Sequence, residues 1–420
     1  MITRRLLTAG RGGGSGTGGS GFVQPDLTPF TVLAPPNAGW WTEVTGPHAM
    51  YANGKTYIGW IAGNTRPNDV EIAAISNTTR AVEGPTLVRD NLTPSGSTSP
   101  DSHNNPAVLV RSDGRILMVY CGHSEPEMHA RISTNPYDIS SFGTEFTIDP
   151  ITGGFTYPYL AQLTSTGRIF LFIRRELGGV ADFVLTTSDD GGATWAAGFS
   201  FFHSQSNPVA LYGAYASDGV NRIDLAFINR SYDDPAKFGL YHGYMNAAGT
   251  VFKTNGTTIG GSFPYYHADF TEVAADGTGD YPYSLVLTND GRPVIGYQSK
   301  YKDPVELGEY RWSGSAWAKH VILTTAPAAP GATSVGGGVH DTSDSLRFLT
   351  GRMVSGEPTI WLYTSTDDGV TWSGSQIAEL VNPTLSPANV QAAAGGLSFL
   401  WFTGTFTSGS NFDIGLDALA

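Results

Sequence analysis

The stretch "SDGRILMVY", Ser112–Tyr120, decides the fold, because related stretches recur along the whole chain. In each of them a turn rich in Gly or Asp precedes a run of apolar, β-prone residues, which is the pattern of the second half of a β-hairpin. The related stretches are "NGKTYIGWI" (Asn53–Ile61), "STGRIFLFI" (Ser165–Ile173), "SDGVNRIDLAFI" (Ser217–Ile228), "NDGRPVIGY" (Asn289–Tyr297), "SDSLRFLTG" (Ser343–Gly351) and "AGGLSFLWF" (Ala394–Phe402). Seven such units predict a repeat architecture.

The turns of these units recur every 51 to 72 residues, which leaves room for three or four short strands in each unit. That spacing is typical of a β-propeller. We therefore predict an all-β fold, a seven-bladed β-propeller with four-stranded antiparallel blades, and keep six blades as the alternative. The last unit ends after its third strand. We expect "GWWTEV", Gly39–Val44, to supply the missing strand and close the ring, so that no sheet edge is left exposed.

The composition agrees with a turn-rich β protein and limits the partners. The chain has 420 residues with 53 glycines, 12% aromatic and 15% charged residues. Its formal net charge of -13 argues against a nucleic-acid partner. The single cysteine, Cys121, lies in an apolar run, so we expect a buried strand residue and no intrachain disulfide. No run reaches the roughly 18 apolar residues of a membrane span, so we expect no membrane insertion.

The N-terminal segment differs from the rest of the chain. Residues 1–25 contain "AGRGGGSGTGGSG" and are predicted to form a flexible, Gly-rich tether, whereas residues 26–420 form a single propeller domain. The segment lacks the apolar region of a secretory signal. A short head followed by a glycine hinge resembles the start of some phage tail proteins. This predicts attachment to a larger assembly through the tail, and leaves open a secreted or a virion-associated protein that acts on extracellular glycan.

Two eight-residue boxes show which face of the ring carries function. "SDDGGATW" (Ser188–Trp195) and "STDDGVTW" (Ser365–Trp372) lie 177 residues apart, about three repeats. Their Asp and Ser or Thr side chains can bond to backbone N–H groups of the turn, and the Trp can pack between strands. We interpret the boxes as structural. They lie on the face of the turns between first and second strands, so we expect function on the opposite face.

Polar and aromatic residues recur on that opposite face, where first strands begin and second strands end. The second strands end in cationic or titratable residues, which in a chain of net charge -13 predict a ring that binds anions. The candidates at these strand ends are His123, Arg174, Arg175, Arg230, Lys300 and Arg352. The candidates at the beginnings of first strands are His103, Asn104, Tyr157, Tyr159, Tyr215 and His340.

His, Tyr and Arg together suit β-elimination of a polysaccharide that contains uronic acid. An arginine neutralises the substrate carboxylate, and His or Tyr side chains remove the adjacent proton and protonate the leaving oxygen. We therefore expect catalysis by His103 and His123, together with Arg174 and with Tyr157 or Tyr159. The remaining candidates named above are assigned to substrate binding. The expected partner is an anionic polysaccharide, and the reaction requires no cofactor.

The boxes, combined with a propeller, resemble the Asp-box (BNR) repeat proteins, whose best-known members are sialidases. "DSHNNPAVLVRSDGRILMVYCGH" and "TYPYLAQLTSTGRIFLFIRRE" more closely resemble the BNR-type propellers that include the seven-bladed ulvan lyases. This resemblance implies acid, base or positioning roles for His103 and His123, proton transfer by Tyr157 and carboxylate neutralisation by Arg174 or Arg175. Tyr215 or Tyr212 is a weaker match in the next unit. On this basis we assign catalysis to His103, His123, Tyr157 and Arg174, and leave Tyr159 among the substrate-binding candidates. Some members of this family hold a structural metal ion, so the resemblance leaves open whether this chain binds a structural calcium or zinc ion. The sequence shows no ligand set, and His242 and His267 remain unassigned.

Two other functions stay open. A sialidase-like glycoside hydrolase could draw an arginine triad from Arg174, Arg230 and Arg352, but the first unit lacks the Arg-Ile-Pro motif expected in sialidases. A non-catalytic glycan-binding propeller of the phage-tail or adhesin type would agree with the Gly-rich tether. The longest unit carries an insertion before its next first strand, and Tyr265, Tyr266 or His267 is expected to form a wall of the substrate site.

Overall fold

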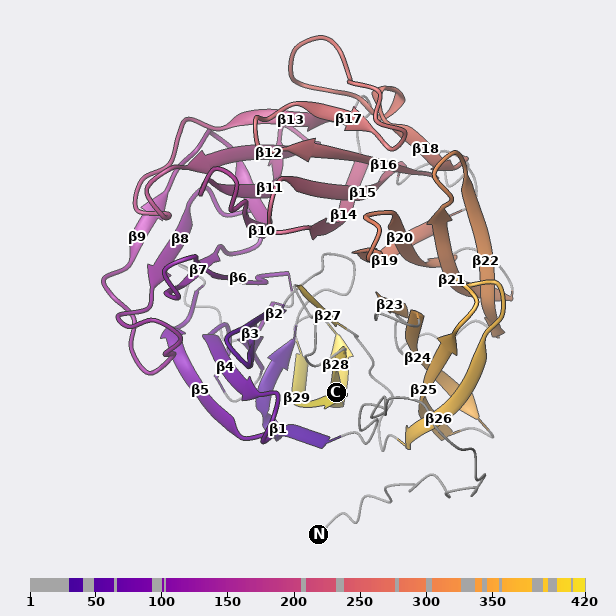
Figure 1. The fold of residues 1–420 in the computed structure, drawn as a ribbon. Helices are drawn as coiled ribbons and strands as arrows, with labels where there is room; N and C mark the ends of the chain where they lie inside the picture. Colours follow the sequence, from indigo (N-terminus) through magenta and orange to yellow (C-terminus); the bar gives the residue numbers. More distant parts are fainter. Residues whose placement is uncertain are drawn as a thin grey trace, which may run out of the picture.

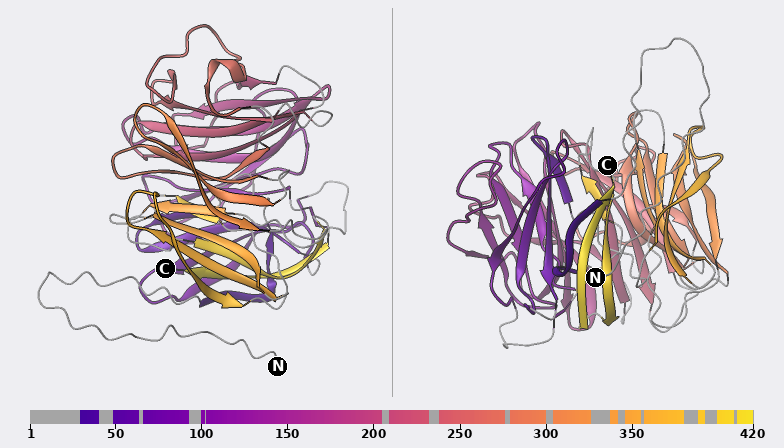
Figure 2. Two further views of the ribbon diagram at one scale, coloured as in Figure 1. Left: turned by 90° about the vertical axis from the view of Figure 1, so that its right-hand side faces the viewer. Right: turned by 90° about the horizontal axis from the view of Figure 1, so that it is seen from below.

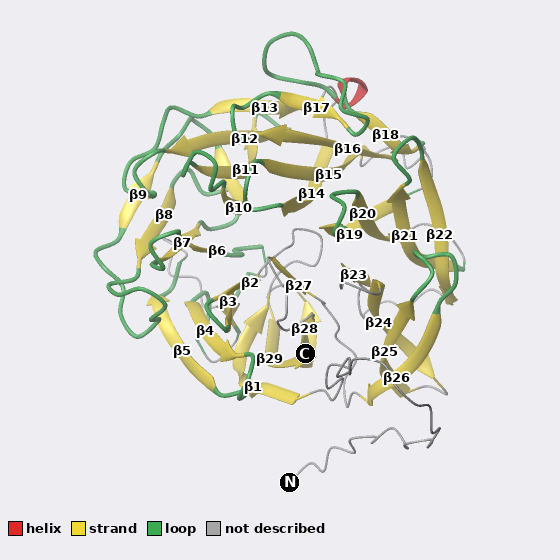
Figure 3. Ribbon diagram, viewed as in Figure 1, coloured by secondary structure: helices red, strands yellow, loops and turns green. Residues whose placement is uncertain are grey.

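The computed structural model describes most of the chain beyond residue 29. The described residues are 30–40, 49–63, 66–92, 100–101, 103–204, 209–231, 238–275, 279–299, 304–325, 337–341, 346–354, 357–379, 388–391, 399–408 and 411–419. The predicted tether, residues 1–25, lies outside them. Strands surround a central axis in a ring (Figure 1), and the described residues include one short 3-10 helix, η2 (His267–Asp269), at the outer edge (Figure 3). The all-β propeller is confirmed.

Four of the six sheets are simple four-stranded antiparallel blades. The first consists of β6 (Ala107–Val110), β7 (Ile116–Tyr120), β8 (Met128–Ile132) and β9 (Phe146–Ile148), and the second of β10 (Gly154–Gln162), β11 (Ile169–Leu177), β12 (Val180–Ser188) and β13 (Phe199–His203). The third consists of β19 (Asp280–Leu287), β20 (Pro293–Ser299), β21 (Val305–Trp312) and β22 (Trp317–Thr325), and the fourth of β23 (Gly337–Asp341), β24 (Leu346–Val354), β25 (Glu357–Ser365) and β26 (Ser373–Glu379). These blades agree with the predicted repeat.

A further blade contains β14 (Val209–Ser217), β15 (Arg222–Ser231), β16 (Phe238–Asn246) and β17 (Val251–Lys253), with an added strand, β18 (Thr271–Ala274), that also pairs with β16. The two outer strands share the edge of β16 because β17 pairs with residues 243–245 and β18 with residues 240–242. The long insertion therefore ends by completing the outer edge of its own blade.

The sixth sheet has eight strands and contains both ends of the chain. Its order is β1 (Phe30–Trp40), β29 (Asn411–Leu419), β28 (Phe399–Ser408), β27 (Ala388–Gln391), β2 (Ala49–Ala52), β3 (Lys55–Ala62), β4 (Val70–Ser76) and β5 (Val82–Arg89). It consists of two antiparallel runs of four strands, which are joined by the parallel pairing of β2 with β27 and by the pairing of the end of β1 with β3. The predicted number of seven separate blades is therefore wrong, and the structure has six, the stated alternative.

The ring closes through the N-terminal strand, although the predicted residues were wrong. Residues 30–38 of β1 pair with β29, whereas Gly39 and Trp40 pair with β3 (Figure 2). The closing strand thus begins before the expected stretch at Gly39–Val44, of which residues 41–44 lie outside the described part. Because β1 covers the outer edge of the last hairpin, that edge is not left open to other chains.

Aromatic and aliphatic side chains fill the space between neighbouring blades. One buried cluster joins the blades of β10 to β17 and includes Phe172, Phe183 and Phe227. Cys121 is fully buried among apolar residues, as predicted, and burial raises the pKa of its thiol to about 12. No helix in the described part of the chain has the length and apolar character needed to cross a lipid bilayer.

The first box stabilises its own turn. The Ser188 hydroxyl accepts a hydrogen bond from the Gly192 backbone (2.7 Å) and donates one to Asp190 (2.8 Å). Asp190 accepts from the backbone and the hydroxyl of Thr194 (2.9 and 2.6 Å), and the Trp195 indole donates to the Gly192 carbonyl (3.1 Å). The second box repeats these contacts from Ser365 to Trp372. These contacts support the structural interpretation of both boxes.

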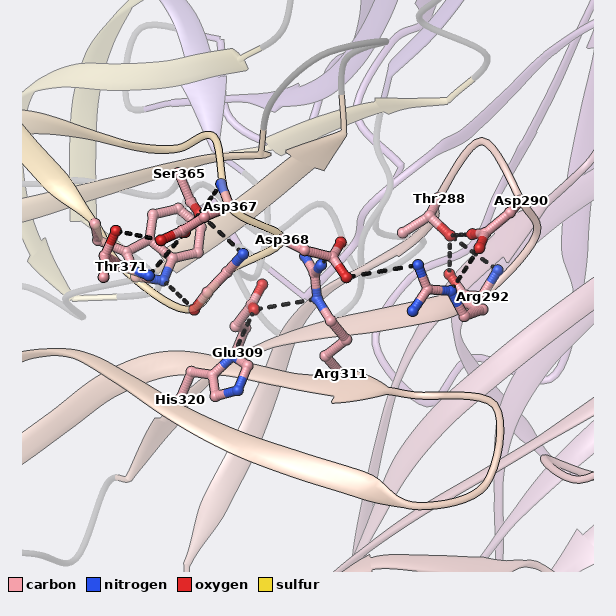
Figure 4. A network of polar contacts seen from close by, with 12 residues as sticks. Thr288, Asp290, Arg292, Glu309, Arg311, His320, Ser365, Asp367, Asp368 and Thr371 are labelled. Atoms are coloured by element: carbon pink, nitrogen blue, oxygen red, sulfur yellow. Dashed lines mark hydrogen bonds and ion pairs between the residues drawn. The ribbon is translucent and has the colours of Figure 1, made fainter.

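The second box also joins two blades (Figure 4). Asp368 pairs with Arg311 of β21 and lies 3.6 Å from Arg292, which follows the turn between β19 and β20. Arg311 in turn lies 3.4 Å from the fully buried Glu309, which also contacts the His320 imidazole at 3.1 Å. The boxes therefore lie at the end of the ring that carries the turns between first and second strands, as predicted. We call this end the box face and the opposite end the site face.

Replacing Asp190 by alanine is expected to lower the free energy of unfolding by about 1 kcal/mol, because it removes hydrogen bonds that are open to water. Hydrogen bonds from the Thr194 side chain and backbone lower the pKa of Asp190 to about 2. A depressed carboxyl pKa stabilises the fold above the ordinary pKa of aspartate, and this contribution disappears as the pH falls through about 2. Urea unfolding of the variant and the wild type at neutral pH and near pH 2 measures both effects.

The exposed Asp149 provides the matched control, since Asp149→Ala removes a carboxylate outside any box. Equal stability of Asp190→Ala and the wild type at neutral pH would contradict the structural role of the box.

Candidate functional site

Two histidines and an aspartate form a cluster on the site face. His103 precedes β6 and His123 follows β7, so both lie at the same end of one blade. Their imidazole rings stack with centroids 4.3 Å apart and an angle of 17° between the planes. Asp101 lies beside both rings, with one carboxylate oxygen 2.5 Å from Nδ1 of His103 and the other 3.3 Å from Nδ1 of His123. Each ring thus turns Nδ1 to Asp101 and keeps Nε2 for another partner.

The chain around Asp101 is held by the neighbouring unit. The Asp101 carboxylate accepts the His103 backbone N–H (3.0 Å), which closes a tight turn. The Asp101 backbone N–H donates to the side chain of Asn68 (2.8 Å), a buried residue of the loop between β3 and β4. The Asn104 amide donates to the same oxygen (3.2 Å) and is fully buried. The structure therefore places Asn104 beneath the cluster, where it supports the turn.

The cluster keeps a negative charge next to two accessible imidazoles. Burial would raise the pKa of Asp101, but hydrogen bonds with His103 and His123 outweigh this effect and hold the pKa well below its usual range. The side chains of His103 and His123 are 36% and 35% exposed. Asp101 can therefore orient both rings as a carboxylate, while substrate can reach them.

Arg174 of β11 lies against two neighbouring tyrosine rings. Its side chain is only 5% exposed, and its guanidinium carbon lies 5.0 Å from the ring centre of Tyr157 and 5.5 Å from that of Tyr212. Burial would lower the pKa of Arg174, but the two tyrosines and Glu176 outweigh this effect and raise it. Arg174 is thus a buried, permanently charged cation that cation–π contacts hold in place.

Tyr157 joins this cation to the histidine cluster. Its ring centre lies 6.1 Å from that of His103 and 6.0 Å from that of Tyr212. Tyr157 has a φ of 58°, and the register between β10 and β11 shifts between Thr156 and Tyr159. A non-glycine residue at positive φ costs roughly 1–3 kcal/mol and persists only where the surroundings impose it. The bulge thus gives Tyr157 a direction that regular strand alternation would not.

Of the twelve predicted site residues, the structure brings together the four to which catalysis was assigned: His103, His123, Tyr157 and Arg174. It places Tyr159 and Tyr215 elsewhere, in the apolar core, where their rings stack 4.4 Å apart. Arg175 is buried too, and donates to Asp182 of β12 and to the Thr152 carbonyl. Neighbouring strand residues point to opposite faces, so Arg174 and Arg175 cannot both reach the cluster.

In the described part of the chain, the structure does not bring the remaining predicted residues to the histidine cluster. Some of them have a strand position but no described side chain, and the residues of the predicted wall lie elsewhere. The structure gives the strand positions of Arg230 (β15), His340 (β23) and Arg352 (β24) and no more, while Lys300 lies outside the described residues. Tyr265 is buried in the core, and the η2 helix that begins at His267 lies at the outer edge of the ring (Figure 3). His242 is fully buried and contacts Asp224 (3.1 Å) and Thr254 (2.9 Å), and burial lowers its pKa.

Sequence reasoning missed two acidic residues of the site. Asp101 was visible in the sequence D-x-H, two residues before His103, but received no role. Glu176, two residues after Arg174 on the same strand face, pairs with the Arg174 guanidinium. Strand periodicity could have suggested Glu176, because residues i and i+2 of a strand share a face.

The same cluster could hold a metal ion. Among the described residues, one group could supply the ligands: the possible ligand atoms of Asp101, His103 and His123 all lie within 4.8 Å of one another. Two imidazoles and a carboxylate are ligand types that zinc accepts. Here, however, Nδ1 of each ring already faces the carboxylate.

Comparisons with known proteins agree on the family and the fold. A family model described as "BNR repeat-containing family member" matches residues 55–324. An ulvan lyase of Alteromonas sp. (strain LOR) is 25% identical over 212 residues, and ulvan lyase-PL25 of Pseudoalteromonas sp. (strain PLSV) is 26% identical over 207 residues. Each match covers 45% of this chain but only 41% of the relative. The chain thus matches less than half the length of these curated relatives.

The solved structure of a PL25 ulvan lyase bound to -[GlcA(1-4)Rha3S]- has a similar fold, with a TM-score of 0.73 at 18% identity. The superposition covers 92% of this chain and 94% of that one. The polysaccharide lyase Uly1 is a more distant neighbour, with a TM-score of 0.57 and 13% identity over 93% of this chain and 98% of the other. These likenesses show that the chain has the fold of these lyases.

Proposed function

The chain belongs to the BNR repeat-containing family, and on this premise we propose that it is a polysaccharide lyase that cleaves an anionic, uronic-acid-containing polysaccharide by β-elimination. One observation carries the proposal: the buried guanidinium of Arg174 lies next to Tyr157, which also lies next to His103 of the stacked His103–His123 pair. A buried cation beside three groups able to transfer protons is the constellation that this elimination needs.

The reaction divides naturally among these side chains. Arg174 binds the uronate carboxylate and stabilises the negative charge that develops on it when the proton at C5 leaves. A base takes that proton, the electron pair forms the C4–C5 double bond, and the C4–O bond breaks. An acid protonates the departing glycosidic oxygen. His103, His123 and Tyr157 supply the base and the acid, and Asp101 directs Nε2 of each imidazole away from itself.

The relatives suggest which substrate to test first. Both curated relatives are named ulvan lyases, and the solved structure with a similar fold holds glucuronic acid linked to a sulfated rhamnose. A carboxylate next to the cleaved bond is what Arg174 would recognise. Ulvan is therefore the first candidate substrate of this chain, followed by other polymers of glucuronic or iduronic acid.

Incubation with a panel of uronic-acid polysaccharides tests the proposal. We expect ultraviolet absorbance from an unsaturated uronate product on at least one of them. Release of free sialic acid, with no unsaturated product on any polymer, would instead support a sialidase-like hydrolase. Binding without any product would support a glycan-binding module.

Removal of metal ions is expected to leave the activity unchanged, because Asp101 already engages both imidazoles and the elimination needs no Lewis acid. Dialysis against EDTA, with mock dialysis as the control, measures this. Loss of activity that added zinc restores would show that Asp101, His103 and His123 hold a functional metal.

A further inference from the structure

The buried arginine of the site, Arg174, already binds a carboxylate of the protein itself, that of Glu176. Arg174 and Glu176 lie two residues apart on β11, and Nη2 of Arg174 donates to one oxygen of Glu176. The hydroxyl of Ser124, in the loop after His123, donates to the other oxygen (3.0 Å). The exposed fraction of the Glu176 side chain is 41%, against 5% for Arg174. The acid is thus the partner that can turn out into water.

The pairing leaves the arginine incompletely satisfied. Nε and Nη1 of Arg174 are buried and have no hydrogen-bond partner among the described residues. A carboxylate binds a guanidinium through two parallel bonds by using Nη2 together with either Nε or Nη1. Glu176 therefore accepts one N–H of the nitrogen that both arrangements share, and its carboxylate lies where a second one would bind.

Two other arginines of the chain bind a carboxylate through two hydrogen bonds instead of one. Arg168 binds Asp189 through both Nε (2.7 Å) and Nη2 (3.0 Å), and Arg222 binds Asp224 through the same two nitrogens, each at 2.6 Å. Glu176, by contrast, makes a single bond to Arg174. The single bond and the N–H groups that lack a hydrogen-bond partner are the features expected of a partner that can be exchanged.

We propose that Glu176 occupies the place of the substrate carboxylate in the resting protein and leaves Arg174 when a uronate binds. The inference rests on the proposed function and adds a residue that determines specificity. A neutral sugar cannot displace Glu176, because it would leave a buried cation without a counter-charge. An acidic sugar replaces one carboxylate by another and can use Nη2 together with a second nitrogen. Glu176 thereby selects acidic over neutral sugars next to the cleaved bond.

The variant Glu176→Gln tests the proposal, because glutamine keeps the shape and removes the competing charge. We expect the KM for the uronic-acid polysaccharide to fall about two- to fivefold and kcat/KM to rise, the range expected when a partly exposed ion pair no longer has to be broken. Glu127→Gln is the matched control, since it removes the same charge from an exposed position of the loop that carries Ser124. Ser124→Ala releases one oxygen of Glu176 and should shift KM in the same direction.

A KM for Glu176→Gln equal to that of Glu127→Gln would overturn the proposal, since the effect would then be general electrostatics. A fall in kcat/KM would also overturn it and would show that Glu176 holds Arg174 in position. If neither the wild type nor any variant cleaves any polymer, the proposed lyase activity is contradicted, but the displacement of Glu176 can still be tested. The test is then calorimetric measurement of the binding of a glucuronate-containing oligosaccharide. Tighter binding to Glu176→Gln than to both the wild type and Glu127→Gln then supports displacement, and any other order contradicts it.

Discussion

Replacing Arg174 by alanine is expected to lower kcat/KM on the uronic-acid polysaccharide by about a hundred- to a thousandfold, the effect of removing one preorganised charge that stabilises the transition state. The physical reason is that Arg174 is buried against Tyr157 and Tyr212, where water cannot replace its charge. Initial rates of formation of the unsaturated product measure the loss. Arg174→Lys should also be strongly impaired, because an ammonium group cannot make two parallel bonds to a carboxylate.

Arg168→Ala is the matched control for this experiment. Arg168 follows the turn between β10 and β11 on the box face and pairs with the exposed Asp189. This variant should keep the wild-type kcat/KM, and thermal unfolding of both variants checks that each is folded. A folded Arg174→Ala variant with wild-type kcat/KM would remove carboxylate neutralisation from the mechanism.

The double variant His103→Ala/His123→Ala is expected to lose about a hundred- to ten-thousandfold in kcat, the usual contribution of general acid–base groups. The two imidazole rings stack and both contact Asp101, and the ring centre of His103 lies 6.1 Å from that of Tyr157. The double variant therefore leaves Tyr157 as the one proton-transfer group proposed for the site. Steady-state kinetics at several pH values measures the loss and any change in the pH profile.

His129→Ala controls for the loss of an imidazole from the same blade. His129 lies in β8 and contacts Glu145 at 3.6 Å, away from the cluster. Its removal should leave kcat unchanged. A double variant that keeps the wild-type pH profile and kcat would show that the two histidines have no role in the reaction.

The repeat could be predicted from sequence because each unit carries its own local signal. A turn rich in Gly or Asp that is followed by an apolar run indicates a β-hairpin, and this signal needs no information from other parts of the chain. The number of separate sheets depends instead on a few pairings between distant parts of the chain. These are the parallel pairing of β2 with β27 and the pairing of β1 with both β29 and β3. The position of the closing strand likewise depends on long-range pairing with β29, and no local pattern in β1 reports it.

The site could be predicted in part because strand ends meet at one face of a propeller. This topology placed His103 and His123 near Arg174 and near Tyr157 or Tyr159, and the family resemblance then chose Tyr157. The topology could not separate Tyr157 from Tyr159, because the bulge at positive φ breaks the alternation of β10. Nor could it choose between Arg174 and Arg175, since the choice depends on Asp182, a buried carboxylate on the neighbouring strand that pairs with Arg175.

The most direct test of the central claim is cleavage of the polysaccharide in water labelled with heavy oxygen, followed by mass spectrometry of the products. Elimination breaks the C4–O bond without adding water, so we predict an unsaturated uronate at the new non-reducing end. We expect labelled oxygen only at the reducing-end hemiacetal, and to the same extent in unlabelled product incubated in labelled water without the protein. A saturated uronate at the new non-reducing end, in products that have gained one water for each cleaved bond, would show hydrolysis and would contradict the account.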